Sequence, residues 1–97
     1  MERWVSLDER MKSLGFLVGI ASTLYVLDLN RNAMLIVEGE RVKGFSERRF
    51  SFYKMIYANG KRVHLKVYRE RVSASDMFVN VNSFMEYKKR KGDVGRG

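Results

Sequence analysis

Residues 50–69 read FSFYKMIYANGKRVHLKVYR and consist of two alternating runs that meet at Asn59-Gly60. Asn and Gly both tolerate the positive φ angles that a two-residue type I′ turn requires, so this pair is a strong hairpin signal. Counting outward from the turn fixes the register and predicts that Tyr53 faces Lys66. We therefore expect an antiparallel hairpin here, with the rest of the fold arranged around it.

The predicted register separates the hairpin side chains into two faces, because directly opposed residues share a face. One face is apolar and is expected to pack on the core: Phe52, Ile56, Ala58, Val63, Leu65 and Val67. The other face interleaves aromatic and basic side chains: Tyr53, Met55, Tyr57, Arg62, His64, Lys66 and Tyr68. Because single-strand binders combine aromatic stacking with cationic contacts to phosphates, the second face is a candidate nucleic-acid platform. A solvated face held by cross-strand pairs, or a face covered by a helix, are the structural alternatives.

The charge of the chain is unevenly distributed. Its net charge is +8 and its pI is about 10.1. Residues 41–97 carry 15 basic and 5 acidic residues, whereas residues 1–40 carry 4 basic and 6 acidic residues. A basic balance of this kind indicates a polyanionic partner such as nucleic acid, or an anionic membrane surface. Charge that serves solubility alone is the alternative.

Two clusters of basic residues stand out in the second half. The connection before the hairpin contains Arg41, Lys43, Arg48 and Arg49, and the end of the chain contains Lys88, Lys89, Arg90 and Lys91. Either cluster can hold a phosphate backbone without reading a base sequence. For the second cluster, a cap that complements the dipole of a C-terminal helix is an equal alternative.

The amino-acid composition excludes several classes of functional site. There is no Cys, which excludes disulfides and thiolate ligands or nucleophiles, and a single His excludes sites that need two imidazoles. Glu38 and Glu40 would share a strand face, with Asp28 near the far end of the same hairpin, but the pattern places no third carboxylate for a two-metal nuclease. We therefore predict that the protein is not an enzyme and that it uses no metal and no cofactor.

The N-terminal part predicts a helix followed by a hairpin. Ser6 and Glu9 fit a capping box, and apolar residues at helical spacing predict a helix over about 7–20. Strands are expected over about 23–29 and 33–37, joined by an Asn-rich turn. Both strands are apolar on both faces, so they need cover on both sides, from helices or from a second subunit. This pattern predicts a homodimer.

The C-terminal part predicts a second helix. Ser73 and Asp76 fit another capping box, and apolar residues at helical spacing predict a helix over about 74–90. Residues 78–82 also alternate, which leaves a strand as the alternative over the first half of this segment. The apolar run over residues 14–29 is too short to cross a bilayer, so we expect no membrane partner and a cytoplasmic protein.

The order α-β-β-β-β-α predicts an α+β fold, with a single four-stranded antiparallel sheet of two consecutive hairpins flanked by an N-terminal and a C-terminal helix. Residues 1–91 are expected to form one domain, and residues 92–97 a flexible C-terminal tail. The predicted function is that of a small basic nucleic-acid-binding protein, for DNA or RNA, which combines phosphate contacts with the aromatic and basic hairpin face. The alternative is a homodimeric protein-interaction or regulatory module whose charge serves solubility.

Overall fold

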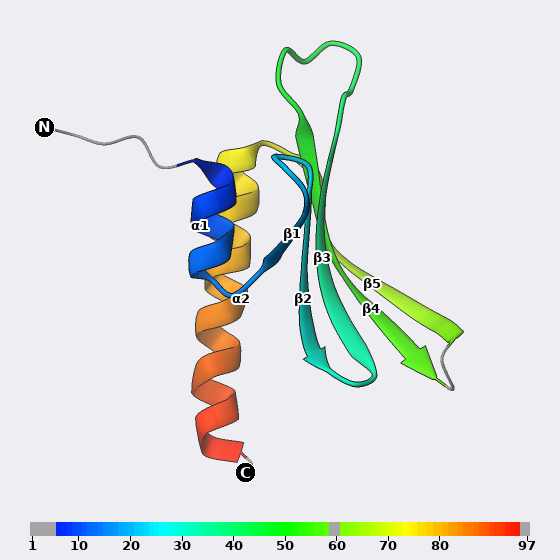
Figure 1. Cartoon of the computed structure of the whole chain (residues 1–97), viewed down its shortest axis with the longest axis vertical. Helices are drawn as coiled ribbons and strands as arrows, with labels where there is room; N and C mark the ends of the chain where they lie inside the picture. The colour runs from blue at the N-terminus through cyan, green and yellow to red at the C-terminus, as the bar shows by residue number, and fades with distance from the viewer. Residues whose placement is uncertain (1–5, 59–60, 96–97) are drawn as a thin grey trace, which may run out of the picture.

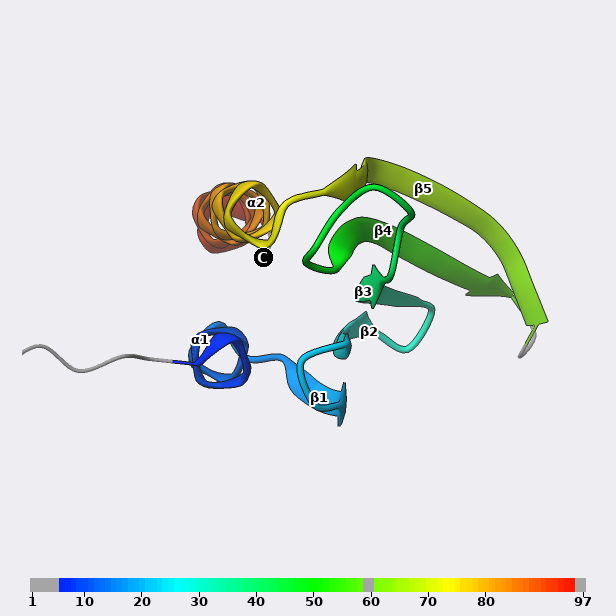
Figure 2. The same cartoon turned by 90° about the horizontal axis from the view of Figure 1, so that it is seen from above.

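A computed structural model of the chain describes residues 6–58 and 61–95, and of residues 62–63 and 90–95 it describes the backbone alone. Along these residues the elements are α1 (Leu7–Ser13), β1 (Leu17–Ile20), β2 (Leu24–Asn30), β3 (Ala33–Glu40), β4 (Arg49–Ala58), β5 (Lys61–Val72) and α2 (Ala74–Gly95). The strands form one antiparallel sheet in the order β1-β2-β3-β4-β5, and both helices pack on the same face of it (Figure 1, Figure 2). The predicted α+β class is confirmed. The predicted count of four strands is wrong, because the described residues form five.

The first helix begins at the predicted cap. Ser6 Oγ accepts from the Glu9 amide at 3.1 Å, and Glu9 Oε1 accepts from the Ser6 amide at 3.2 Å. Asp8, in the first turn, accepts from the Tyr25 hydroxyl at 2.6 Å and from the Ser22 amide at 2.8 Å. These two bonds lower the pKa of the Asp8 carboxyl, while burial and the bond to Asp8 raise the pKa of the Tyr25 hydroxyl. The start of α1 is thereby tied to β2 and to the turn that precedes it.

The fifth strand exists because α1 ends early. Gly15 has a φ of +100°, a left-handed conformation that glycine adopts without steric cost. Its amide donates to Lys12 O, and the Phe16 amide donates to Met11 O, which are the two hydrogen bonds of a Schellman motif. The prediction of a helix to residue 20 is therefore wrong, and residues 17–20 pair with β2 instead.

The core lies between the sheet and the two helices. Its buried side chains come from both helices, the strands and the α1–β1 connection: Met11, Phe16, Tyr25, Leu35, Val37, Phe50, Phe52, Met77 and Val81. Gly39 faces Phe50 across the β3–β4 ladder, and a Cβ at this glycine would lie 2.6 Å from Phe50 Cε2. The aromatic ring therefore occupies the space that any other residue at this position would need.

The hairpin of β4 and β5 keeps the predicted register only beside its turn, and the predicted turn residues themselves lie outside the described ranges. A bulge then brings Ile56 opposite His64 rather than Val63. Because strand side chains alternate, this shift by one residue transfers Leu65, Lys66 and Val67 to the other face, and the register shifts again between Tyr53 and Phe50. Leu65 and Val67 are 44% and 55% exposed on the face away from the helices, so their prediction as core residues is wrong.

The second helix begins at its predicted cap, where Ser73 Oγ accepts from the Asp76 amide at 3.1 Å. Residues 78–82 are helical, as the capping pattern favoured, and do not form a strand. The helix continues to Gly95 and includes residues 92–95 of the predicted tail. Within the part of the chain that the structure describes, neither helix is long and apolar enough to cross a membrane.

Candidate nucleic-acid interface

A hollow of about 530 Å³ lies between α2, the end of β2 and the middle of β4 and β5. Three lysines and three aromatic rings line it, together with two residues of β2: Lys54, Lys66, Lys88, Tyr68, Phe84, Tyr87, Leu29 and Asn30. We call this hollow the lysine–tyrosine pocket. Its volume falls within the range of pockets that hold small organic ligands.

The aromatic side of the pocket is a packed cluster. The Tyr68 ring centroid lies 5.0 Å from that of Phe52 and 5.2 Å from that of Phe84. Phe52 and Phe84 meet edge to face at 5.6 Å, and Phe52 is fully buried. Tyr87, one helical turn after Phe84, is 55% exposed. The pocket therefore offers a Tyr68 ring held by its neighbours and an outer Tyr87 ring open to solvent, and aromatic rings of this kind can stack on a base.

The basic side of the pocket concentrates positive charge. Lys54 and Lys66 lie directly opposite each other in the β4–β5 ladder, a placement in which like charges destabilise a sheet. Lys66 Nζ lies 5.6 Å from the Tyr68 ring centroid, within cation–π range. Among the described residues, no carboxylate forms an ion pair with these lysines or with Lys88, so their charge is available to an external anion.

The structure brings together three of the predicted site residues, Lys66, Tyr68 and Lys88, in the lysine–tyrosine pocket. Tyr53 lies on the opposite face of the sheet, where its hydroxyl donates to Glu38 Oε1 at 2.9 Å. The prediction of one continuous aromatic and basic hairpin face is therefore wrong, because the bulge in the β4–β5 ladder places Tyr53 and Lys66 on different faces.

The remaining hairpin and helix residues are dispersed. His64 is exposed and lies on the same face as Lys66. Tyr57 is half-buried, and its backbone amide donates to Asn32 O at 2.7 Å. The side chains of three predicted site residues lie outside the described part of the chain: Arg62, Arg90 and Lys91.

The basic loop between β3 and β4 lies at the opposite end of the sheet from the end of β4, the start of β5 and the end of α2 (Figure 1). Arg41 and Arg48 line a separate hollow of about 340 Å³ next to the start of α1. The Arg49 guanidinium lies 4.2 Å from the Phe45 ring centroid, and Lys43 is exposed. The loop and the lysine–tyrosine pocket are therefore two distinct basic sites rather than one.

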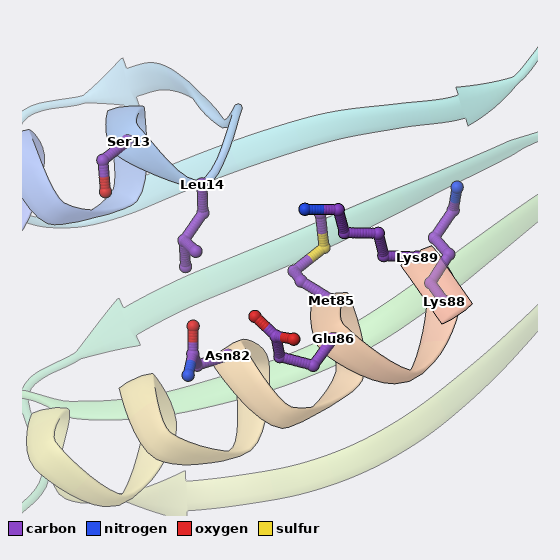
Figure 3. A pocket seen from close by; sticks show the side chains of 7 residues that line it. All are labelled: Ser13, Leu14, Asn82, Met85, Glu86, Lys88 and Lys89. Atoms are coloured by element: carbon purple, nitrogen blue, oxygen red, sulfur yellow. The ribbon is translucent and has the colours of Figure 1, made fainter. Parts of the chain in front are cut away.

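Lys89 belongs to a third hollow, of about 390 Å³, between the end of α1 and α2 (Figure 3). Leu14 approaches it from α1 and Met85 from α2, with the Glu86 carboxylate alongside. This carboxylate makes the third hollow less suited to an anion than the lysine–tyrosine pocket. Lys88 borders both hollows.

Sequence reasoning missed the other basic and aromatic residues of the pocket, namely Lys54, Phe84 and Tyr87. Lys54 interrupts an otherwise apolar face between Phe52 and Ile56. A cation within an apolar alternation breaks the local pattern, and such breaks are expected at functional sites. Phe84, Tyr87 and Lys88 follow at spacings that place them on one side of a helix. The bulge in the β4–β5 ladder, which the sequence does not reveal, brings Lys66 and Tyr68 of β5 to the same face as Lys54.

The acidic residues considered for metal chemistry have other partners. Glu38 accepts from Tyr53, and Glu40 Oε2 accepts from Arg71 Nε at 2.9 Å. Among the side chains that the structure describes, no group of three or more His, Asp or Glu residues is placed to hold a metal ion.

This chain has a curated relative that aligns with almost its whole length. It is 49% identical over 90 residues to the uncharacterized protein YddA of Bacillus subtilis (strain 168), an alignment that covers 92% of this chain and 88% of YddA. No family model matches the chain. No solved structure matches it either.

Proposed function

The chain belongs to the family of Bacillus subtilis YddA, and we propose that it is a nucleic-acid-binding protein whose strand-binding site is the lysine–tyrosine pocket. The observation that carries this proposal is the convergence of Lys54, Lys66 and Lys88 around exposed aromatic surface, with no acidic partner among the described residues. Phosphates meet the lysines, and a base enters the hollow against Tyr68 and Tyr87.

A single strand fits this arrangement better than a duplex. Bases in a duplex are stacked on one another and present only their edges, whereas single-stranded bases are free to stack on aromatic side chains. The partly exposed Tyr87 ring can stack on a base, and the opposed Lys54 and Lys66 can contact adjacent phosphates. We therefore expect single-stranded DNA or RNA to bind more tightly than a duplex of equal length.

Fluorescence anisotropy titrations with labelled single-stranded and duplex oligonucleotides, at about 50 mM and about 200 mM salt, test the proposal. Affinity for the single strand should fall steeply between the two salt concentrations. Absence of binding to all oligonucleotides at the lower salt concentration would refute nucleic-acid binding.

A charge-matched pair of variants locates the site. Neutralising two phosphate contacts with Lys54→Gln/Lys66→Gln should reduce the slope of log affinity against log salt by about 1.4 for a single strand. The control Lys12→Gln/Lys61→Gln removes the same net charge outside the pocket lining and should leave the slope unchanged. If Arg48→Gln/Arg49→Gln abolishes binding while the pocket variant retains it, the β3–β4 loop is the site instead.

A further inference from the structure

The face of the sheet away from the helices carries an apolar row across all five strands. The cross-strand pairs place opposite one another, in order, Leu17, Val26, Ile36, Tyr53 and Val67. A second row alongside consists of Met34, Met55 and Leu65, with Asp28 at its end. We call this surface the open face, because no described element covers it (Figure 2).

The open face exposes side chains that monomeric proteins usually bury. Leu17 on β1 is 68% exposed, and Val67 and Leu65 on β5 are 55% and 44% exposed, whereas Ile36 at the centre of the first row is 7% exposed. Leu65 and Val67 also line a shallow hollow of about 250 Å³ with Tyr53. Contiguous apolar surface of this kind marks an interaction site rather than scattered surface variation.

The size of the open face matches the lower limit of a stable protein interface. Strands lie about 4.8 Å apart, so five strands span about 19 Å, and the 8 residues of β3 extend about 27 Å. One face is thus on the order of 500 Å², and two such faces bury on the order of 1,000 Å², the minimum expected of a specific complex.

The charge around the open face favours a second copy over a polyanion. Carboxylates lie on this face or at its edge, namely those of Asp28, Glu38, Glu40 and Glu70. The pocket lysines lie on the other face, so two chains of net charge +8 can meet here without opposing their lysines. Arg71 pairs with Glu40 at the same rim, so a two-fold axis can set acidic groups of one copy against basic groups of the other.

We propose that the open face is the contact surface of a homodimer, in which two copies pack sheet against sheet. Aligned sheets pack about 10 Å apart with interdigitating side chains, and the rows through Ile36 and Met34 would form the centre of that layer. The two lysine–tyrosine pockets then lie on the outer sides of the dimer. The proposal does not depend on nucleic-acid binding, because it uses the other face of the sheet.

Sedimentation velocity of the full chain, from about 1 μM to about 100 μM, tests this proposal over the concentration range of a micromolar dimer. The wild type should shift from monomer to dimer across the range. Val67→Lys places a charge at an exposed position of the open face and should weaken dimerisation at least tenfold. The matched control Val79→Lys changes a 60% exposed Val on α2 and should dimerise as the wild type does.

Circular dichroism verifies that both variants are folded, and Leu17→Lys provides a second open-face substitution should Val67→Lys unfold. A wild type that stays monomeric up to about 100 μM overturns the proposal. Dimerisation lost in Val79→Lys and kept in both open-face variants also overturns it. Oligonucleotide affinity of the monomeric variants reports separately on the lysine–tyrosine pocket.

Discussion

The two faces of the five-stranded sheet differ in whether helices of the same chain cover them. The covered face packs Tyr25, Val37 and Phe52 under the two helices, and these side chains are almost inaccessible to solvent. The open face presents equally apolar residues, such as Val26 and Met34, without a helix over them. Strands that are apolar on both faces require two covers, and the chain supplies one of them from the elements described here. The packing on the covered face therefore explains the stability of the folded chain, and the exposed apolar residues of the open face indicate association with another chain.

The largest expected difference between the faces is in the free energy of unfolding. Phe52→Ala removes a buried ring that contacts Tyr68 and Phe84, and should cost about 3–5 kcal/mol. Val67→Ala on the open face should cost less than about 1 kcal/mol in the monomer. Urea unfolding at low protein concentration measures both, and equal losses would contradict the distinction between the faces.

Gly39 tests how tightly the covered face is packed. Gly39→Ala should destabilise by about 1–3 kcal/mol, because its Cβ would collide with the Phe50 ring. In Gly39→Ala/Phe50→Leu the smaller side chain makes room, so the double variant should lose less than the sum of the two single losses. Additive losses in a double-mutant cycle would mean that the ring does not occupy this space.

The attachment of α1 to the covered face should depend on pH. Asp8→Ala removes the acceptor of the Tyr25 hydroxyl and should cost about 1–2 kcal/mol near pH 7. Because the folded pKa of Asp8 lies below its ordinary value of 3.8, this contribution is complete above pH 3.8 and is lost as the pH falls through the folded pKa.

Thermal unfolding of the wild type and Asp8→Ala should therefore converge as the pH falls below the folded pKa of Asp8. Glu9→Ala, which removes a capping group outside this contact, serves as the control. A difference between the wild type and Asp8→Ala that is unchanged at acid pH would exclude the Asp8–Tyr25 bond as its cause.

The smallest expected effect concerns the edge of the covered face, where the lysines lie. Lys54→Met removes the repulsion from Lys66 and should stabilise the fold by about 0.2–1 kcal/mol. The same substitution should weaken oligonucleotide binding, because it removes a proposed phosphate contact. A residue that serves function can in this way conflict with local stability. A variant that loses both stability and affinity would identify Lys54 as a structural residue.

Local signals in the sequence predicted much of the fold. Both capping residues, Ser6 and Ser73, cap the helices as predicted, and the strands now called β2 and β3 lie close to their predicted ranges. Gly15 was also readable as a helix stop, but the apolar periodicity continues past it and favours a longer helix. A glycine that can end a helix and apolar residues that continue at helical spacing favour different helix ends, and in this structure the helix ends at the glycine.

The candidate site could be predicted only in part. Lys66, Tyr68 and Lys88 were identified from charge and aromatic content, whereas Lys54 and Tyr87 depend on tertiary contacts. The bulge in β4–β5 adds one residue to one strand and so exchanges the faces of the residues beyond it. Alternation alone carries no information on where such a shift occurs.

An NMR titration of the labelled protein with a short single-stranded oligonucleotide at low salt tests the central claim most directly. The largest changes in amide shifts should cluster around Lys54, Lys66 and Tyr87, with little change at Val26 and Ile36 on the open face. Shifts confined to the open face or to the β3–β4 loop, or no shifts at all, would contradict a strand-binding site at the lysine–tyrosine pocket.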